Sequence, residues 1–310
     1  HTMNKRGIII FGAHGFIARH LIPALAKQGH PLIALARRHA HIPPGVELHV
    51  APFDTPAQFT PLLERAHTVV HVASCSTPGA TAGKPLVELA DNLRPTLALL
   101  EAWQNAPHCR LLYVSSGGTL YGDTNGHPAD ENMPPRPRSY YGAAKAAAEC
   151  FIHAATQQFA LSATLLRPSN LYGPGQEMRG GFGIIPTAFA HAQRNEPLTI
   201  WGDGSAIRDY LYIDDFIRLC LDIIEQPMPI GAHAFNVASG HPVSLMELLE
   251  HIQTITGKKL TIQYDVNRPV DIARIELDTR KIRTTYAWQP QVSLEEGLTR
   301  TWQWWQTHSA

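Results

Sequence analysis

A short apolar run that leads into a glycine loop constrains the fold more than any other feature of the sequence. The run Gly7–Phe11 is continuously apolar, which is typical of a strand buried on both faces of a parallel sheet. Gly12 and Gly15 follow at once, and then an apolar-periodic helix that ends at Gly29. A glycine loop before a helix N-terminus lets the backbone approach a pyrophosphate, whose charge the helix dipole favours. The spacing predicts a dinucleotide-binding unit; the alternative is a tight turn that binds nothing.

The end of the next predicted strand, Leu32–Ala36, bears on which dinucleotide binds. In this type of fold an acidic residue there bonds the 2′-hydroxyl of NAD, whereas an arginine can pair with the 2′-phosphate of NADP. Here no acid is present, and Arg37 and Arg38 stand side by side. The pattern favours NADP(H), with NAD possible and a solvated basic strand end as the alternative.

Four further strands are predicted to alternate with helices, at residues 47–51, 68–73, 110–114 and 163–166. This alternation predicts a doubly wound parallel sheet, at whose carboxyl edge ligands bind. His71 alternates with apolar neighbours and is expected in the core. The helix expected over 86–105 carries Pro95, which should kink it or mark a new first turn. After about residue 173 proline and glycine become frequent and short strands mix with helices. We therefore expect a nucleotide domain over 3–172 and a smaller, irregular α/β substrate lobe over 173–310, with chain exchange between the two. The first domain is counted from Met3 because His1-Thr2 looks like a vector remnant.

Composition excludes several other functional classes. The 310 residues carry no formal net charge and no Lys/Arg block, which argues against a nucleic-acid or polybasic membrane role. The longest apolar runs are too short to span a bilayer. The four cysteines are scattered without Cys-x-x-Cys spacing, so no metal or redox site is expected, and free thiols suit a reducing cytoplasm.

A helix predicted from Tyr141 to Phe159 carries the strongest catalytic candidate. Tyr141 and Lys145 are four residues apart, so the phenol and the ammonium lie on one helical face. A neighbouring cation favours the phenolate, which makes tyrosine a usable base near neutral pH. This pattern alone is common, and it gains weight only from its context.

The motifs in their order along the chain resemble the extended short-chain dehydrogenase/reductase family, and in particular its nucleotide-sugar epimerases, dehydratases and reductases. The resemblance covers almost the whole chain. It rests on Gly12-x-x-Gly15-x-x-Ala18, Asp54, Ser115-Ser116, Tyr121-Gly122, Tyr141-x-x-x-Lys145, Arg167-Pro168-x-Asn170, Arg208-Asp209-Tyr210, Asn236 with Gly240, and Arg268-Pro269.

The resemblance implies a Rossmann-type domain and a set of site residues. Tyr141 would be the acid/base at the sugar, and Lys145 would hold the nicotinamide ribose. The cofactor would further contact Gly12, Gly15, Phe16, Ile17, Arg37, Arg38, Asp54, Ala73, Ser115 and Pro168. The sugar nucleotide would contact Asn170, Arg208, Arg268, Gly117 and Gly118, since guanidinium groups bind phosphate oxygens in a bidentate manner. A surface ion pair is the alternative for each arginine.

One departure concerns the catalytic loop. Gly117 stands where the family usually carries a Ser or Thr that hydrogen-bonds the sugar oxygen, so Ser116 or Thr119 must replace it, or Tyr141 acts alone; we favour Thr119. The loop also lacks the carboxylates of the dehydratases. Elimination needs an acid and a base at neighbouring carbons, so a dehydratase is not expected.

Three functions remain open. A nucleotide-sugar 4-epimerase acting through a 4-keto intermediate is favoured, and an NADPH-dependent reductase of a 4-keto-6-deoxy sugar is the alternative. A dinucleotide-binding sensor without catalysis is the third. The resemblance also implies a homodimer, formed through the Tyr141 helix and the helix over 86–105.

Overall fold

A computed structural model describes residues 6–73, 80–124, 126–178, 183–267 and 272–308. The chain forms two compact units, each assembled from segments that are far apart in sequence. The first consists of His1–Ser116, Ser139–Arg167 and Ile217–Phe235, and the second of Gly117–Arg138, Pro168–Phe216 and Asn236–Ala310.

A seven-stranded sheet with the order β11-β6-β5-β4-β1-β2-β3 is the centre of the first unit. Its strands are β1 (Gly7–Phe11), β2 (Leu32–Ala36), β3 (Glu47–Val50), β4 (Ala66–His71), β5 (Arg110–Val114), β6 (Ser162–Pro168) and β11 (Gly231–Val237). Every pairing from β3 to β6 is parallel. β1 lies between β2 and β4, so the chain reverses its direction of travel across the sheet there. The predicted doubly wound parallel sheet is confirmed.

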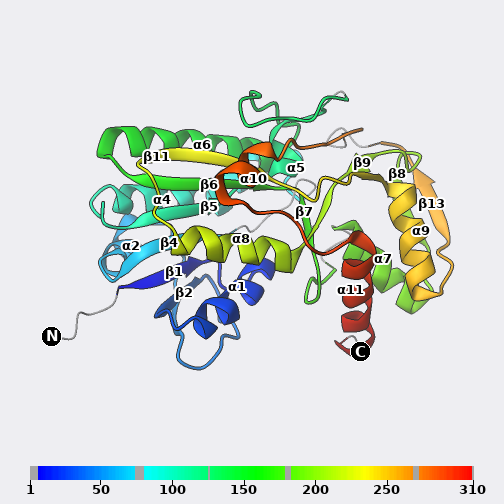
Figure 1. Cartoon of the computed structure of the whole chain (residues 1–310), viewed down its shortest axis with the longest axis horizontal. Coiled ribbons are helices and arrows are strands. Elements are labelled where there is room, and N and C mark those ends of the chain that lie inside the picture. Colours follow the sequence, from blue (N-terminus) through cyan, green and yellow to red (C-terminus); the bar gives the residue numbers. More distant parts are fainter. Residues whose placement is uncertain (1–5, 74–79, 125, 179–182, 268–271, 309–310) are drawn as a thin grey trace. The chain divides into compact units, whose positions relative to one another are not determined.

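Helices cover both faces of this sheet. They are α1 (Phe16–Lys27), α2 (Pro56–Leu63), α3 (Pro85–Glu88), the π-helical turn η1 (Leu89–Leu93), α4 (Arg94–Trp103), α6 (Tyr140–Phe159) and α8 (Ile213–Glu225). Alternate strand residues such as Ile9 and Phe11 form one core cluster with apolar side chains of α2, α4 and α6. Figure 1 shows α1 and α8 on the other side of the sheet. Burial on both faces explains why β1 and β2 read as continuous apolar runs.

The helix expected over 86–105 changes from α-helical to π-helical geometry before Pro95. Proline has no N–H to donate within a helix, so Pro95 disturbs the regular α-helical hydrogen bonding and suits a first turn. The chain accordingly forms the wide turn η1 first, and α4 begins at Arg94 with Pro95 in its first turn. The prediction that Pro95 marks a new first turn is confirmed. Helical turns follow one another without a gap from Pro85 to Trp103, so the expected helix is present and ends two residues before Asn105.

The second unit combines short strand pairs with helices. Its elements are α5 (Gly117–Leu120), β7 (Asn170–Tyr172), α7 (Ile184–Arg194), β8 (Leu198–Trp201), β9 (Ile207–Arg208), β10 (Tyr210–Tyr212), β12 (Val243–Ser244), α9 (Leu245–Thr256), β13 (Ile262–Asp265), α10 (Arg280–Tyr286) and α11 (Leu294–His308). Three two-stranded sheets pair β10 with β7, β12 with β9 and β13 with β8. Trp302 of α11 stacks on Phe189 of α7 with ring centroids 5.5 Å apart, so it packs in the core of this unit. Across the described ranges, no helix combines the length and apolarity that a bilayer crossing requires.

Candidate functional site

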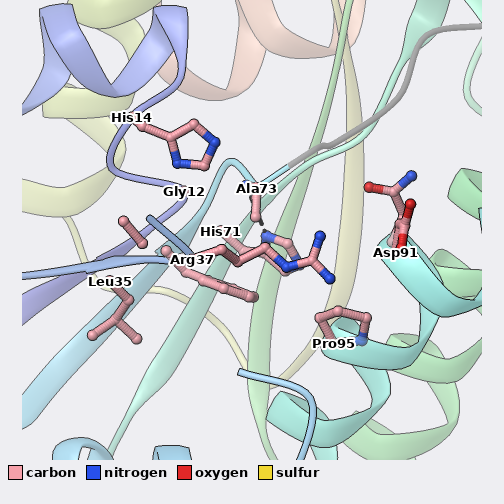
Figure 2. Close-up of a pocket in the computed structure, with 11 residues that line it drawn as sticks. Gly12, His14, Leu35, Arg37, His71, Ala73, Asp91 and Pro95 are labelled. Carbon is pink, nitrogen blue, oxygen red and sulfur yellow. Dashed lines mark hydrogen bonds between the residues drawn. The ribbon is translucent and has the colours of Figure 1, made fainter. Parts of the chain in front are cut away.

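The glycine loop borders a pocket in the first unit, beside the carboxyl ends of β1, β2 and β4 (Figure 2). Gly12 has a φ of +108°, and a Cβ there would lie 2.6 Å from the backbone nitrogen and Cα of Ala73, so only glycine fits. Gly15 is the N-cap of α1, and no side chain among the described residues caps that helix. The backbone N–H groups of Phe16 and Ile17, in the first turn of α1, can therefore donate to a phosphate.

The lining of this pocket suits the adenosine end of a dinucleotide. It consists of Phe11, Gly12, His14, Leu35, Ala36, Arg37, His71, Ala73, Asp91, Asn92 and Pro95. Figure 2 shows the Arg37 guanidinium pointing into the pocket, on the side of Asp91. Arg38 is exposed and is not part of this lining. Asp54 is half-buried beyond β3, and its backbone N–H donates to Gln58 Oε1 at 3.0 Å. Asp54 does not line this pocket.

A buried histidine fixes one wall of the pocket. The Ala73 N–H donates to His71 Nδ1 at 3.2 Å, so the ring proton lies on Nε2 and is donated to Thr96 Oγ1 at 2.8 Å. Burial, and then the charge of Lys145, hold the pKa of His71 well below its ordinary value. His71 is thus the neutral core histidine that the strand pattern predicts.

Tyr141 and Lys145 lie in the same unit, on α6. Ser139 caps this helix, and its Oγ accepts from the Gly142 N–H at 3.1 Å. Lys145 is 8% exposed; its Nζ donates to Val114 O at 3.2 Å and lies 5.7 Å from the centroid of the Tyr141 ring. Burial lowers the pKa of Lys145 to about 8, although nearby carboxylates act in the opposite direction. The helical spacing therefore brings the phenol and the ammonium together.

Ser115 follows β5 and takes part in a buried ionic network. Its Oγ donates to Glu149 Oε2 at 2.6 Å, and Arg167 Nε and Nη2 donate to the Glu149 carboxylate at 2.6–3.1 Å. Sequence reasoning missed Glu149, although its place four residues after Lys145 puts it on the same face of α6. Pro168 ends β6, directly after Arg167.

Ser116 and Thr119 are the candidates for the hydroxyl group that Gly117 lacks. In the sequence they stand on either side of the point where the first unit's segment ends and the second unit's begins. Ser116 is the half-buried last residue of its segment in the first unit. Gly117, Gly118 and Thr119 lie in the single turn α5 of the second unit, with Gly117 buried and Thr119 half-buried.

The candidates for the sugar nucleotide lie in the second unit, as far as they are described. Asn170 is exposed at the start of β7, and half-buried Arg208 ends β9 with its Nη1 donating to Ile207 O at 2.9 Å. Asp209 holds these segments together: its carboxylate accepts from Ser169 Oγ and from the N–H groups of Ser239 and Gly240, at 2.6–3.0 Å. Arg268 lies outside the described residues.

Asn236 is structural in this unit. It is fully buried, and its amide accepts from the Tyr121 hydroxyl at 2.6 Å and donates to Ala129 O at 2.8 Å. Within the part of the chain that the structure describes, no cluster of His, Cys, Asp and Glu side chains could hold a metal ion.

Comparisons with known proteins agree with this fold. The model of the NAD dependent epimerase/dehydratase family matches residues 8–238. A UDP-glucose 4-epimerase of Mycolicibacterium smegmatis is 29% identical over 94% of this chain and 96% of its own. The dTDP-4-dehydro-6-deoxyglucose reductase of Escherichia coli is 25% identical over 95% and 96%. The crystal structure of the UDP-glucose 4-epimerase of Thermus thermophilus in complex with NAD has a TM-score of 0.90 at 26% identity, and covers 97% of this chain and 99% of that one.

Proposed function

The chain belongs to the NAD dependent epimerase/dehydratase family, and we propose that it is a 4-epimerase of a nucleotide-diphosphate sugar, acting through a transient 4-keto sugar. Its relatives are nucleotide-sugar epimerases and reductases, so it is an enzyme of this class. One observation carries the assignment to redox chemistry at a sugar hydroxyl. The Tyr141–Lys145 pair lies in the same unit as the dinucleotide pocket beside Gly12.

The proposed chemistry assigns a task to each group. The Lys145 ammonium favours the Tyr141 phenolate, which accepts the proton of the sugar C4 hydroxyl. A nicotinamide dinucleotide, when bound, would supply the acceptor and the donor of the hydride at C4. Tyr141 gives its proton back to the C4 oxygen, and the configuration is inverted when the keto sugar has presented its other face. We further propose that Asn170 and Arg208 bind the diphosphate of the sugar nucleotide.

A 4-keto-sugar reductase is the second candidate, and Arg37 favours it. The guanidinium lies in the pocket where a 2′-phosphate of NADP(H) could be bound. A reductase must exchange its cofactor at every turnover, whereas an epimerase regenerates the oxidised cofactor in place. The retention of cofactor therefore separates the two functions.

The experiment identifies the dinucleotide that the purified protein retains and the sugar nucleotide that it converts. The protein is denatured, the released dinucleotide is identified by mass spectrometry, and intact protein is assayed with UDP-glucose and UDP-galactose. Stoichiometric NAD together with interconversion of the two sugars supports the epimerase. If the protein is purified without dinucleotide and oxidises NADPH in the presence of a dTDP-4-keto-6-deoxy sugar, it is the reductase and not the epimerase. Bound dinucleotide without either activity would favour the sensor.

We also propose that the protein is a homodimer. The helices that pack beside α6 expose apolar side chains, with Leu86 78% and Leu89 50% accessible, and Phe151 of α6 itself is 50% accessible. A second copy would cover this surface. Light scattering should give twice the mass of the chain for wild type and the monomer mass for Phe151→Glu.

A further inference from the structure

The first unit buries a carboxylate that the proposed chemistry does not yet use. Glu88, the last residue of α3, is 3% exposed. Burying a charged group costs free energy unless hydrogen bonds or an opposite charge compensate it. Asn92, one turn further along, donates from its Nδ2 to Glu88 Oε1 at 2.8 Å. The amide bears no charge, so this bond satisfies an oxygen without neutralising the carboxylate.

The Glu88–Asn92 bond is one end of a polar chain that reaches the dinucleotide pocket. Thr96 Oγ1 donates to Asn92 O at 3.2 Å, and His71 Nε2 donates to Thr96 Oγ1 at 2.8 Å. His71 in turn accepts from the Ala73 N–H at 3.2 Å. Asn92, His71 and Ala73 all line the pocket. Glu88 is therefore connected, bond by bond, to the pocket wall.

Glu88 also lies in the electrostatic surroundings of Lys145. The α3 and η1 segments pack on α6, which carries the lysine. The titratable groups that face Lys145 are Tyr113 (ring centroid 5.2 Å from Nζ) and Tyr141, neutral His71, and the two carboxylates of Glu88 and Glu149. Both carboxylates favour the ammonium against the effect of burial.

The two carboxylates can be separated by experiment because different groups hold them. Glu149 forms a bidentate ion pair with Arg167, so a change at Glu149 also leaves a buried guanidinium uncompensated. The bond from Asn92 to Glu88 comes from an amide, which a neutral glutamine at position 88 can still satisfy. Removing the charge of Glu88 therefore tests its effect on Lys145 while this bond is kept.

We propose that Glu88 is a positioning residue for the Tyr141–Lys145 pair, because its buried carboxylate balances the Lys145 ammonium and its bond to Asn92 fixes one wall of the dinucleotide pocket. The functional part of this inference rests on the proposed role of Lys145. Without the carboxylate, less of Lys145 is protonated near neutral pH, and the Tyr141 phenolate loses the cation that favours it.

The test measures the protonation of Lys145 directly. Wild type, Glu88→Gln, Glu88→Asp and Glu101→Gln are labelled with acetic anhydride across pH 6–11, and acetylation of each lysine is followed by mass spectrometry, with exposed Lys27 as internal reference. Gln keeps an oxygen that can accept from Asn92 and removes the negative charge. Glu101 is an exposed glutamate on neighbouring α4 and serves as the matched control.

We expect the Lys145 midpoint in Glu88→Gln to fall by about one pH unit or more, while Glu101→Gln leaves it in place and Glu88→Asp restores it in part. The alkaline limb of the turnover–pH profile should move to lower pH by the same amount. A Lys145 midpoint in folded Glu88→Gln equal to that of wild type would overturn the proposal. If Glu88→Gln does not fold, a Glu88→Asp midpoint below that of wild type supports it and an unmoved one overturns it. A shifted midpoint with an unshifted turnover profile would instead count against the role of Lys145 in the proposed function.

Discussion

Glu149 and Arg167 form a bidentate ion pair inside the first unit, with side chains only 8% and 9% exposed. α6 supplies the carboxylate and β6 the guanidinium, so the pair ties the helix that carries Tyr141 to the sheet. Breaking such a pair from one side leaves a buried charge without compensation.

Glu149→Ala should therefore lower the free energy of unfolding by about 3–5 kcal/mol, measured by urea denaturation. The double variant Glu149→Met with Arg167→Met should be less destabilised than either single methionine variant, because no charge of the pair remains buried. Glu101→Ala, at an exposed position, is the control and should change stability by about 0.5 kcal/mol or less. A double variant that loses the sum of both single effects would contradict the pairing.

Gly12→Ala should cost about 2 kcal/mol or more of stability and abolish dinucleotide binding, because its Cβ would meet the Ala73 backbone at 2.6 Å and φ is +108°. Gly15→Ala is the matched variant: among the described residues its Cβ would approach only Gly12 O, at 3.4 Å, and φ is −78°. It should keep the wild-type melting temperature while weakening dinucleotide binding at the helix N-terminus. Equal melting temperatures for both variants would show that the loop relaxes.

Tyr141→Phe should reduce turnover of the sugar nucleotide by about 10²–10⁴-fold, the usual contribution of a general acid/base, while the protein still retains dinucleotide. The adjacent Tyr140, 42% exposed, offers the control, and Tyr140→Phe should remain active. Turnover is followed by chromatography of the sugar nucleotides and cofactor content by mass spectrometry. An active Tyr141→Phe enzyme would rule out this residue as the acid/base.

Arg37→Ala should lower the preference for NADP(H) over NAD(H) about tenfold or more, the loss expected for a charge-assisted hydrogen bond to the 2′-phosphate. Arg38→Ala should have a smaller effect, because Arg38 is exposed and does not line the pocket. Dissociation constants for both dinucleotides, measured by calorimetry on each variant, decide this. A larger effect of Arg38 would place the phosphate outside the described pocket.

The Lys145 ammonium should also leave a signature in the pH dependence of stability. Burial lowers its pKa from 10.5 to about 8. Between these pH values the Lys145 amine is protonated in the unfolded chain and neutral in the folded chain. The free energy of unfolding therefore rises with pH across this window. Below about pH 8 the amine is protonated in both states, and its burial destabilises the folded protein in full. The free energy of unfolding of wild type minus that of Lys145→Met should therefore rise from pH 8 to pH 10. A flat difference would mean that Lys145 titrates alike in both states.

Local patterns were sufficient for much of this molecule. The apolar run Gly7–Phe11, the glycine loop and the strand Leu32–Ala36 have the predicted bounds, because burial on both faces of a parallel sheet leaves a continuous apolar signature. The convergence of Tyr141 and Lys145 also follows from helical periodicity alone.

Long-range packing decided the rest. Arg37 and Arg38 are adjacent in the sequence, and the structure places Arg37 in the pocket lining and Arg38 in solvent. The burial of Glu88 depends on the packing of α3 and η1 on α6, and the pairing of Glu149 with Arg167 depends on the packing of α6 on β6. Periodicity reports which face of an element is apolar, whereas the cost of a buried charge is set by the groups that the fold brings against it. The sequence by itself therefore determined the sheet, the glycine loop and the Tyr141–Lys145 pair, and only the tertiary structure decided which charges surround that pair.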